Sequence, residues 1–191
     1  MGDSQLNMHS VTSMLLNRAS EPRLQAPAPP KDVLELALAC AARAPDHGLL
    51  RPWRYLVVEG EGLERLGELF ESSAPADASE AQRAKLRKAP LRAPMVLVAI
   101  ASPKAHPKIP EYEQEYSCAA SAAYLVLALQ AEGYGAMWRS GDPANNEDVC
   151  RGLGLADHES IVGFIYTGTT ISNKPAVPRP EIDEFVSRWP G

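Results

Sequence analysis

Several features that define common enzyme classes are missing from this chain. No Gly-x-Gly-x-x-Gly follows a predicted strand, no phosphate-binding P-loop is present and no Gly-x-Ser-x-Gly elbow occurs. The four histidines lie far apart and lack metal-type spacing to one another or to a cysteine, so no metal site is expected. The common hydrolase, kinase and metalloenzyme signatures are therefore absent.

Cysteine is scarce and positive charge is not in excess. Three scattered cysteines form no disulfide framework, and this favours a reducing, cytoplasmic setting. A net charge of -5 and a pI near 5.4 leave no basic footprint for nucleic acid. The N-terminus lacks the basic and apolar regions of a signal peptide, and the longest apolar run, Cys118–Leu129, is too short to span a bilayer.

The 191 residues, of which 45% are hydrophobic, favour one domain with a substantial core. Residues 1–10 are expected to be disordered. Glu21–Pro30 contains four prolines and is interpreted as a linker or extended arm. After Gly168 the chain is polar and proline-rich but ends with Phe185, Val186 and Trp189. Residues 169–191 are therefore predicted to form an extended C-terminal arm that docks onto another surface.

Hydrophobic spacing predicts more helices than strands, without simple alternation, which indicates an α+β fold. The segment Ser117–Gln130 is apolar nearly all round, so its own sheet and a partner subunit are expected to cover it. Helices are expected at Val11–Arg18 (with Ser10 as a cap), Lys31–Arg43, Glu61–Ser72, Ser79–Ala89, Glu113–Glu132 and Asn145–Gly152. Strands are expected at Arg54–Glu59, Met95–Ala101, Gly135–Arg139 and Ser160–Tyr166.

Two loop clusters place cations and an aromatic residue beside residues that interrupt regular structure. The first runs from Arg43 through Pro45 and Gly48 to Trp53, and the second is Met137–Gly141. Proline disfavours helix at the preceding residue, and glycine permits backbone conformations closed to other residues. Together the two loop clusters could hold an anion beside a flat ring. Taken singly, the same residues are ordinary helix ends, turns and a strand entry.

Taken together, five motifs resemble the nitroreductase family, most closely its compact subgroup. The motifs are Asn17-Arg18-x-Ser20, Arg43-Ala44-Pro45-Asp46-His47, Arg51-Pro52-Trp53, Trp138-Arg139-Ser140-Gly141 and Ile161-Val162-Gly163-Phe164-x-Tyr166-x-Gly168. The resemblance extends from about Val11 to Gly168. It implies an α+β fold with a central mixed or antiparallel sheet flanked by helices, an intertwined homodimer, and flavin mononucleotide (FMN) bound at the subunit interface.

The resemblance also implies roles for individual residues. Arg18 and Ser20, on either side of Ala19, would contact the phosphate and ribityl end of FMN. Arg43 and His47 would reach the flavin from the other subunit. Trp138, Arg139 and Ser140 would line the flavin. Two positions depart from the subgroup pattern: Ala19 stands where relatives often have a second arginine, and Gly48 where a typical relative has a lysine.

The implied activity is transfer of a hydride from NADH or NADPH through FMN to a nitroaromatic compound, a quinone or a similar acceptor, by a ping-pong mechanism. No catalytic side chain is required, because the flavin performs the redox chemistry. The alternatives are a flavin-dependent oxidase or dehalogenase on the same fold, a non-catalytic flavin-binding protein, and a purely structural dimer.

Overall fold

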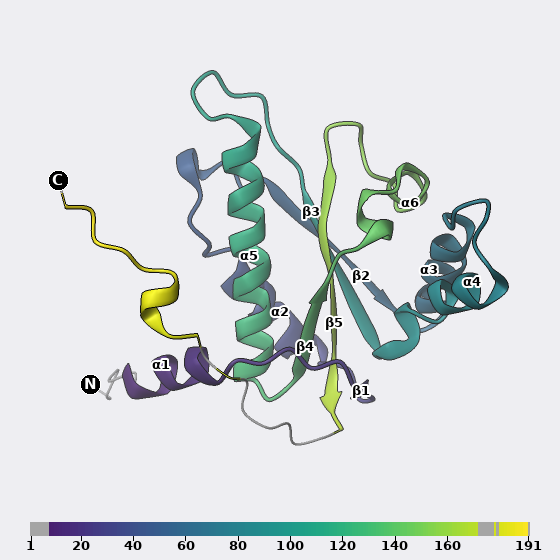
Figure 1. Ribbon diagram of the computed structural model, residues 1–191, viewed down its shortest axis with the longest axis horizontal. Coiled ribbons are helices and arrows are strands. Elements are labelled where there is room, and N and C mark those ends of the chain that lie inside the picture. The colour runs from purple at the N-terminus through teal and green to yellow at the C-terminus, as the bar shows by residue number, and fades with distance from the viewer. Residues whose placement is uncertain (1–7, 172–177, 179, 191) are drawn as a thin grey trace. The chain divides into compact units, whose positions relative to one another are not determined.

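A computed structural model describes residues 8–171, 178 and 180–190. The chain divides into two compact units, one made of the two termini and one of residues 20–172, and each is described by itself. The larger unit is built on a five-stranded sheet, coloured from purple to yellow-green in Figure 1. Its strands are β1 (Leu24–Gln25), β2 (Trp53–Glu59), β3 (Met95–Ala101), β4 (Gly135–Arg139) and β5 (Ser160–Thr170).

Every pairing in this sheet is antiparallel, in the order β1-β5-β3-β2, with β4 also paired to β5. The long strand β5 therefore organises the sheet, because β3 pairs with it and β1 and β4 pair with successive stretches of it. The α+β prediction is confirmed. The predicted strand Ser160–Tyr166 is four residues too short, and the predicted linker Glu21–Pro30 contains β1.

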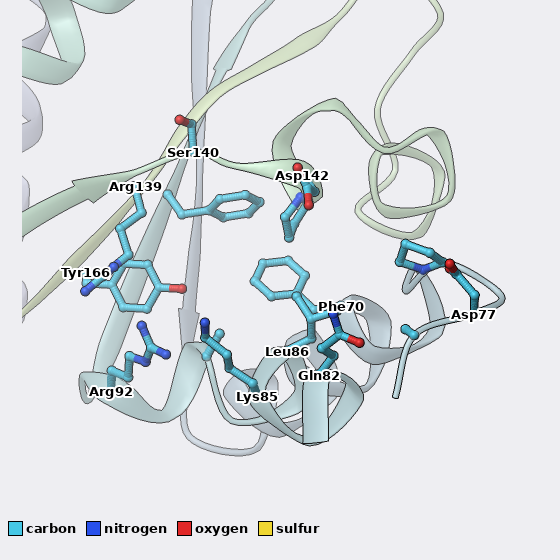
Figure 2. A pocket seen from close by; sticks show the side chains of 15 residues that line it. Phe70, Asp77, Gln82, Lys85, Leu86, Arg92, Arg139, Ser140, Asp142 and Tyr166 are labelled. Carbon is cyan, nitrogen blue, oxygen red and sulfur yellow. The ribbon is translucent and has the colours of Figure 1, made fainter. Parts of the chain in front are cut away.

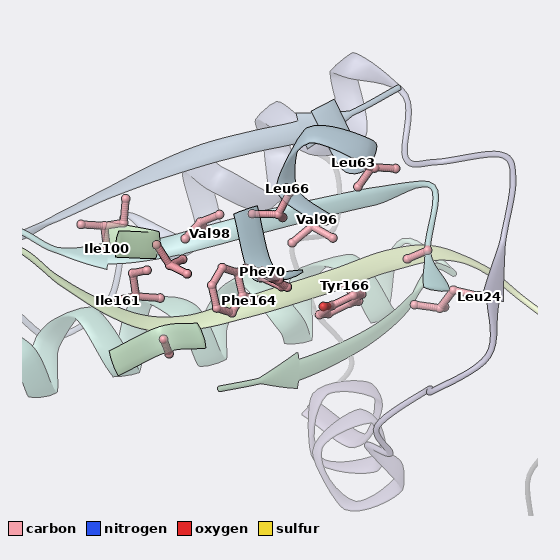
Figure 3. Close-up of a cluster of buried hydrophobic side chains, with 13 residues drawn as sticks. Leu24, Leu63, Leu66, Phe70, Val96, Val98, Ile100, Ile161, Phe164 and Tyr166 are labelled. Atoms are coloured by element: carbon pink, nitrogen blue, oxygen red, sulfur yellow. The ribbon is translucent and has the colours of Figure 1, made fainter. Parts of the chain in front are cut away.

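Helices cover both faces of the sheet. One face carries α2 (Lys31–Ala41) and α5 (Glu111–Ala131), and the other carries α3 (Glu61–Ser72), α4 (Glu80–Arg87) and α6 (Glu147–Gly152), as Figure 1 shows. Strand β3 explains how two cores form, since successive side chains of a strand point to opposite faces. Val96, Val98 and Ile100 enter the core under α3 (Figure 3), and Leu97 and Ala99 enter the core under α2 and α5.

Most helix predictions hold to within a few residues. The predicted Glu61–Ser72 matches α3, and α4 begins after Ser79, whose side chain forms a capping box with Gln82. The predicted Asn145–Gly152 begins two residues before α6, because Asp142–Asn145 forms a 3-10 turn and Asn146 caps α6. In α5, Cys118 is buried and its pKa is raised to about 12 by burial, as expected for a packing thiol.

The terminal unit contains α1 (Met8–Asn17) and the short 3-10 turn η4 (Ile182–Glu184). Helix α1 begins before the predicted Val11, so Ser10 lies inside the helix and is not its cap. Phe185 and Trp189, the predicted apolar anchors, are exposed within the described residues. The remainder of the predicted disordered segment and part of the predicted arm, residues 1–7, 172–177, 179 and 191, lie outside the described residues.

Candidate functional site

A cavity of about 480 Å³ lies between the α3–α4 side of the sheet and the end of β4 (Figure 2). Small-molecule sites in proteins usually have volumes of about 300–1,000 Å³. Its floor is apolar and includes Phe70 and Phe164, whose rings meet edge to face with centroids 5.0 Å apart. Polar side chains from α4, from the turn η2 (Pro90–Arg92) and from β4 surround this floor.

Three cations gather at one end of the cavity: Lys85 from α4, Arg92 from η2 and Arg139 from β4 (Figure 2). In the part of the chain that the structure describes, none of the three has a carboxylate partner or a side-chain hydrogen bond. The Nε of Arg139 is buried and has no partner there. The lining carboxylates, Asp77 and Asp142, lie away from these cations. Uncompensated positive charge in a cavity favours an anionic or electron-rich ligand.

Tyr166 stands among these cations. The guanidinium carbon of Arg139 lies 5.7 Å from the centre of the Tyr166 ring, within cation–π range. Burial raises the pKa of Tyr166, although the charges of Arg139 and Arg92 oppose this. The phenol is therefore neutral at physiological pH and does not cancel the positive charge of the cluster.

Successive side chains of β4 point to opposite faces of the sheet, and this decides which motif residues reach the cavity. Arg139 faces it, whereas the Trp138 ring packs on the opposite face with the α2–α5 core. The indole Nε1 donates a hydrogen bond to the carbonyl of Val162, which stands at a bulge in β5. This indole fits only beside Gly163, because a Cβ at that position would overlap Nε1. The pairing of β4 with β5 ends at Arg139, so the N–H groups of Ser140 and Gly141 lie beyond the ladder.

The loop that carries Arg43 and His47 is strained but well anchored. Leu49 and Arg51 have φ values of 55° and 49°, a region that side-chain-bearing residues seldom adopt. A carboxylate oxygen of Asp46 accepts a 2.7 Å hydrogen bond from the Arg51 N–H and holds this conformation. Such strain concentrates at functional sites. Leu49, at 76% exposure, is presented to solvent by the loop.

Arg43 and His47 are both exposed and do not line the cavity. The Nδ1 of His47 lies 3.0 Å from a carboxylate oxygen of Glu113 at the start of α5. The larger unit therefore does not bring them together with Arg139 and Ser140 in one cavity. Their predicted role as contacts from another subunit stays a prediction.

The Asn17–Ser20 motif spans the boundary between the two units. Arg18 and Ala19 follow the end of α1 in the terminal unit, where the Arg18 N–H contacts the Leu15 carbonyl at 3.4 Å. Ser20 opens the larger unit and is exposed. The next residue, Glu21, is buried and donates its N–H to the carbonyl of Ala136 in β4 at 3.0 Å. Ser20 thus lies next to a segment fixed against β4.

Sequence reasoning missed most of the residues that line the cavity, among them Gln82, Lys85, Arg92 and Tyr166. The charged segment 79–89 is predicted to be a helix, and periodicity alone cannot say which of its charges face a cavity. Tyr166 lay inside a recognised motif, which was the available signal. Among the described residues, no group of His, Cys, Asp or Glu could hold a metal ion, and no helix is long and apolar enough to cross a membrane.

Comparisons with known proteins agree with this architecture. A sequence model of the nitroreductase family matches residues 15–169. YdjA of Escherichia coli strain K12, whose name proposes an NAD(P)H nitroreductase, is 38% identical over 176 residues, which cover 91% of this chain and 96% of YdjA. A nitroreductase-like protein from Bacillus cereus has a TM-score of 0.83 at 25% identity, with full coverage of both chains. A point mutant of the FMN- and NADPH-dependent nitroreductase NfnB from Sphigopyxis sp. strain HMH has a TM-score of 0.75 at 18% identity, covering 95% of this chain and 99% of that one.

Proposed function

The chain belongs to the nitroreductase family, and from that premise we propose that it is an FMN-dependent oxidoreductase. It takes a hydride from NADH or NADPH and reduces a nitroaromatic compound, a quinone or a similar acceptor in a ping-pong cycle. FMN is the cofactor. The observation that carries the proposal is the cavity at the end of β4, where Lys85, Arg92 and Arg139 present positive charge without a carboxylate partner among the described residues.

The residues of this cavity fit a flavin. The buried Nε of Arg139, unpartnered among the described residues, needs an acceptor, and the pyrimidine edge of a flavin offers carbonyl oxygens and ring nitrogens. The apolar floor around Phe164 suits a planar aromatic ring. The N–H groups of Ser140 and Gly141, which lie beyond the β4–β5 ladder, are further donors for the same edge.

When bound, FMN accepts the hydride from the nicotinamide and delivers it to the acceptor. The contribution of this chain is electrostatic and positional. Negative charge on the pyrimidine edge of reduced FMN would be stabilised by Arg139, which is half-buried, and by Lys85, which lines the same cavity. Because these cations have no carboxylate partner among the described residues, their field is not neutralised before the ligand binds.

We further propose that the site is completed by a second copy of the chain in a cytoplasmic homodimer. Arg43 and His47 lie outside the cavity of their own larger unit, and the strained loop presents them and Leu49 to solvent. Helix α5 exposes Tyr112, at 55%, and Tyr116, at 68%. Exposed aromatics of this kind are enriched at protein interfaces. In the dimer, Arg43 and His47 of one copy reach the flavin held by the other, and Arg18 and Ser20 bind its phosphate and ribityl end.

The absorption spectrum of the purified protein, before and after anaerobic NADPH or NADH, tests the activity directly. The expected result is a flavin spectrum that bleaches on addition of the nicotinamide and returns on addition of a nitroaromatic or quinone. Mass analysis of the heat-released chromophore should identify FMN. A protein that holds FMN but does not bleach would support a flavin carrier instead, and a colourless protein that cannot be reconstituted would contradict the proposal entirely.

Light scattering tests the shared site independently. The expected mass is twice 20.7 kDa. Mixing an Arg43→Ala variant with an Arg139→Ala variant should restore part of the flavin binding that each lacks, because mixed dimers contain one intact composite site. A monomer that retains FMN would contradict the shared site but leave the activity standing.

A further inference from the structure

Building on the proposed function, we propose that Tyr166 is a positioning residue: its ring holds the Arg139 guanidinium against the pyrimidine edge of the flavin and thereby sets the reduction potential of bound FMN. Tyr166 comes from β5 and Arg139 from the neighbouring strand β4. The two side chains stand on the same face of the sheet, inside the cavity (Figure 2).

The first argument is that Arg139 has no other side-chain anchor among the described residues. An arginine side chain has many rotamers, and a fixed one normally uses its five N–H groups to bind carboxylates or carbonyls. Arg139 makes no such bond within the described part of the chain, and its Nε is buried without a partner. The contact that orients its guanidinium is the face of the Tyr166 ring, at 5.7 Å. A cation–π contact leaves the N–H edges of the guanidinium free to donate to a ligand.

The second argument is that Tyr166 itself is rigid. It is only 4% exposed and belongs to the core under α3, together with Phe164 and Val96 (Figure 3). Its backbone pairs with β3 on one side and with Met137 of β4 on the other. A ring fixed in this way restricts the guanidinium of Arg139, which would otherwise have many orientations in the cavity.

The third argument concerns charge. A carboxylate partner would hold Arg139 equally well but would cancel its field at the flavin. The neutral phenol holds the cation without cancelling it, and the raised pKa of Tyr166 keeps it neutral despite the nearby Arg92. The arrangement therefore combines a fixed position with full positive charge, which is what preferential stabilisation of reduced FMN requires.

The experiment measures the midpoint potential of bound FMN by anaerobic dye titration, and the FMN dissociation constant by fluorescence, in the wild type and five variants. Tyr166→Leu removes the ring, and Tyr166→Phe keeps it. Arg139→Met removes the cation, and the double variant Tyr166→Leu/Arg139→Met tests whether Tyr166 acts through Arg139. Tyr166→Met serves as a second ring deletion with a more adaptable side chain, should the leucine variant not fold.

In Tyr166→Leu, reduced FMN should bind about tenfold more weakly relative to oxidised FMN, which corresponds to a midpoint potential lowered by about 30 mV. Tyr166→Phe should retain the wild-type potential. In the Arg139→Met background the loss of the ring should have no further effect on the potential. An unchanged potential in Tyr166→Leu, or an equal shift with and without Arg139, would overturn the inference. Failure of the wild-type protein to bind FMN would instead overturn the proposed function.

Discussion

Arg54 and Glu159 form a forked ion pair that ties β2 to the start of β5. The Nε of Arg54 donates to one carboxylate oxygen of Glu159 at 2.7 Å, and Nη2 donates to the other at 2.5 Å. Glu159 also accepts the Ala156 N–H at 3.0 Å, and its side chain is only 7% exposed. Because both geometry and burial are favourable, this pair is expected to contribute measurable stability, unlike the exposed pairs on the helices.

Replacing Glu159 with glutamine should destabilise the protein by about 2 kcal/mol. The substitution removes the charge that Arg54 faces and one of the two acceptor oxygens, while keeping the size of the side chain. Urea unfolding of the two proteins measures the difference. The matched control is Glu35→Gln, which removes an exposed pair with Lys31 at 3.7 Å on α2 and should change the unfolding free energy by less than about 0.5 kcal/mol. Equal effects of the two substitutions would contradict the prediction.

The stabilisation by Glu159 should also disappear at low pH. Hydrogen bonds from Arg54 lower the pKa of Glu159 from its usual 4.5 to about 2. The folded state therefore holds its proton more weakly than the unfolded state, and the stabilisation is complete above the unfolded value of 4.5. It is lost as the pH falls from there towards 2. The difference in unfolding free energy between the wild type and Glu159→Gln should be constant near neutral pH and shrink over that acidic range. A difference independent of pH would argue against an ionised Glu159.

Lys85 and Lys88 provide a matched pair at the end of α4. Both side chains are exposed, but Lys85 lines the cavity and Lys88 does not. Lys85→Met should weaken FMN binding about tenfold, because it removes one of the cations near the pyrimidine edge. Lys88→Met makes the same chemical change at the end of the same helix and should leave FMN affinity near the wild-type value. Fluorescence titration of the apo-proteins measures both, and equal losses would indicate only a general effect of net charge.

Arg18→Ala should lower FMN affinity by about ten- to a hundredfold, the effect of losing a charge-assisted hydrogen bond. The free energy of unfolding of the apo-protein should change little, because Arg18 is exposed just after the end of α1. The control is Arg23→Ala, a nearby exposed arginine outside the motif. Unchanged FMN affinity in Arg18→Ala would mean that this residue serves only the end of its helix.

Helices and strands could be predicted where a segment has one clear pattern of apolar residues. Met95–Ala101 is a continuous apolar run and forms a strand buried at every position, and Gly135–Arg139 forms β4 at the predicted bounds. The short strand β1 could not be predicted, because two residues are too few to show a hydrophobic repeat. Only their pairing with Thr169 and Thr170 makes them a strand. For the same reason β5 extends past Tyr166: its extra residues are defined by their partners in β1 and β4.

The candidate site was predicted only in part. The motif Trp138–Gly141 marked the end of β4, and the structure places Arg139 and Ser140 at the cavity. Spacing along one strand could not reveal that Trp138 points to the opposite face of the sheet and donates to the carbonyl of Val162. Its position depends on which of the two cores each face of β4 packs against. Lys85 and Arg92 were missed because they lie on segments that become neighbours of β4 only after folding.

The sequence by itself determined most of the helices and strands and the family, because hydrophobic periods, glycine and proline positions and short motifs act over a few residues. The tertiary structure decided where charge collects. The cations on α4 and in the turn before β3 lie far along the chain from the cation at the end of β4, yet all three line one cavity together with Tyr166. Their grouping depends on the antiparallel pairing of β3, β4 and β5 and on the packing of α3 and α4 against that face, and such long-range contacts leave no local pattern in the chain.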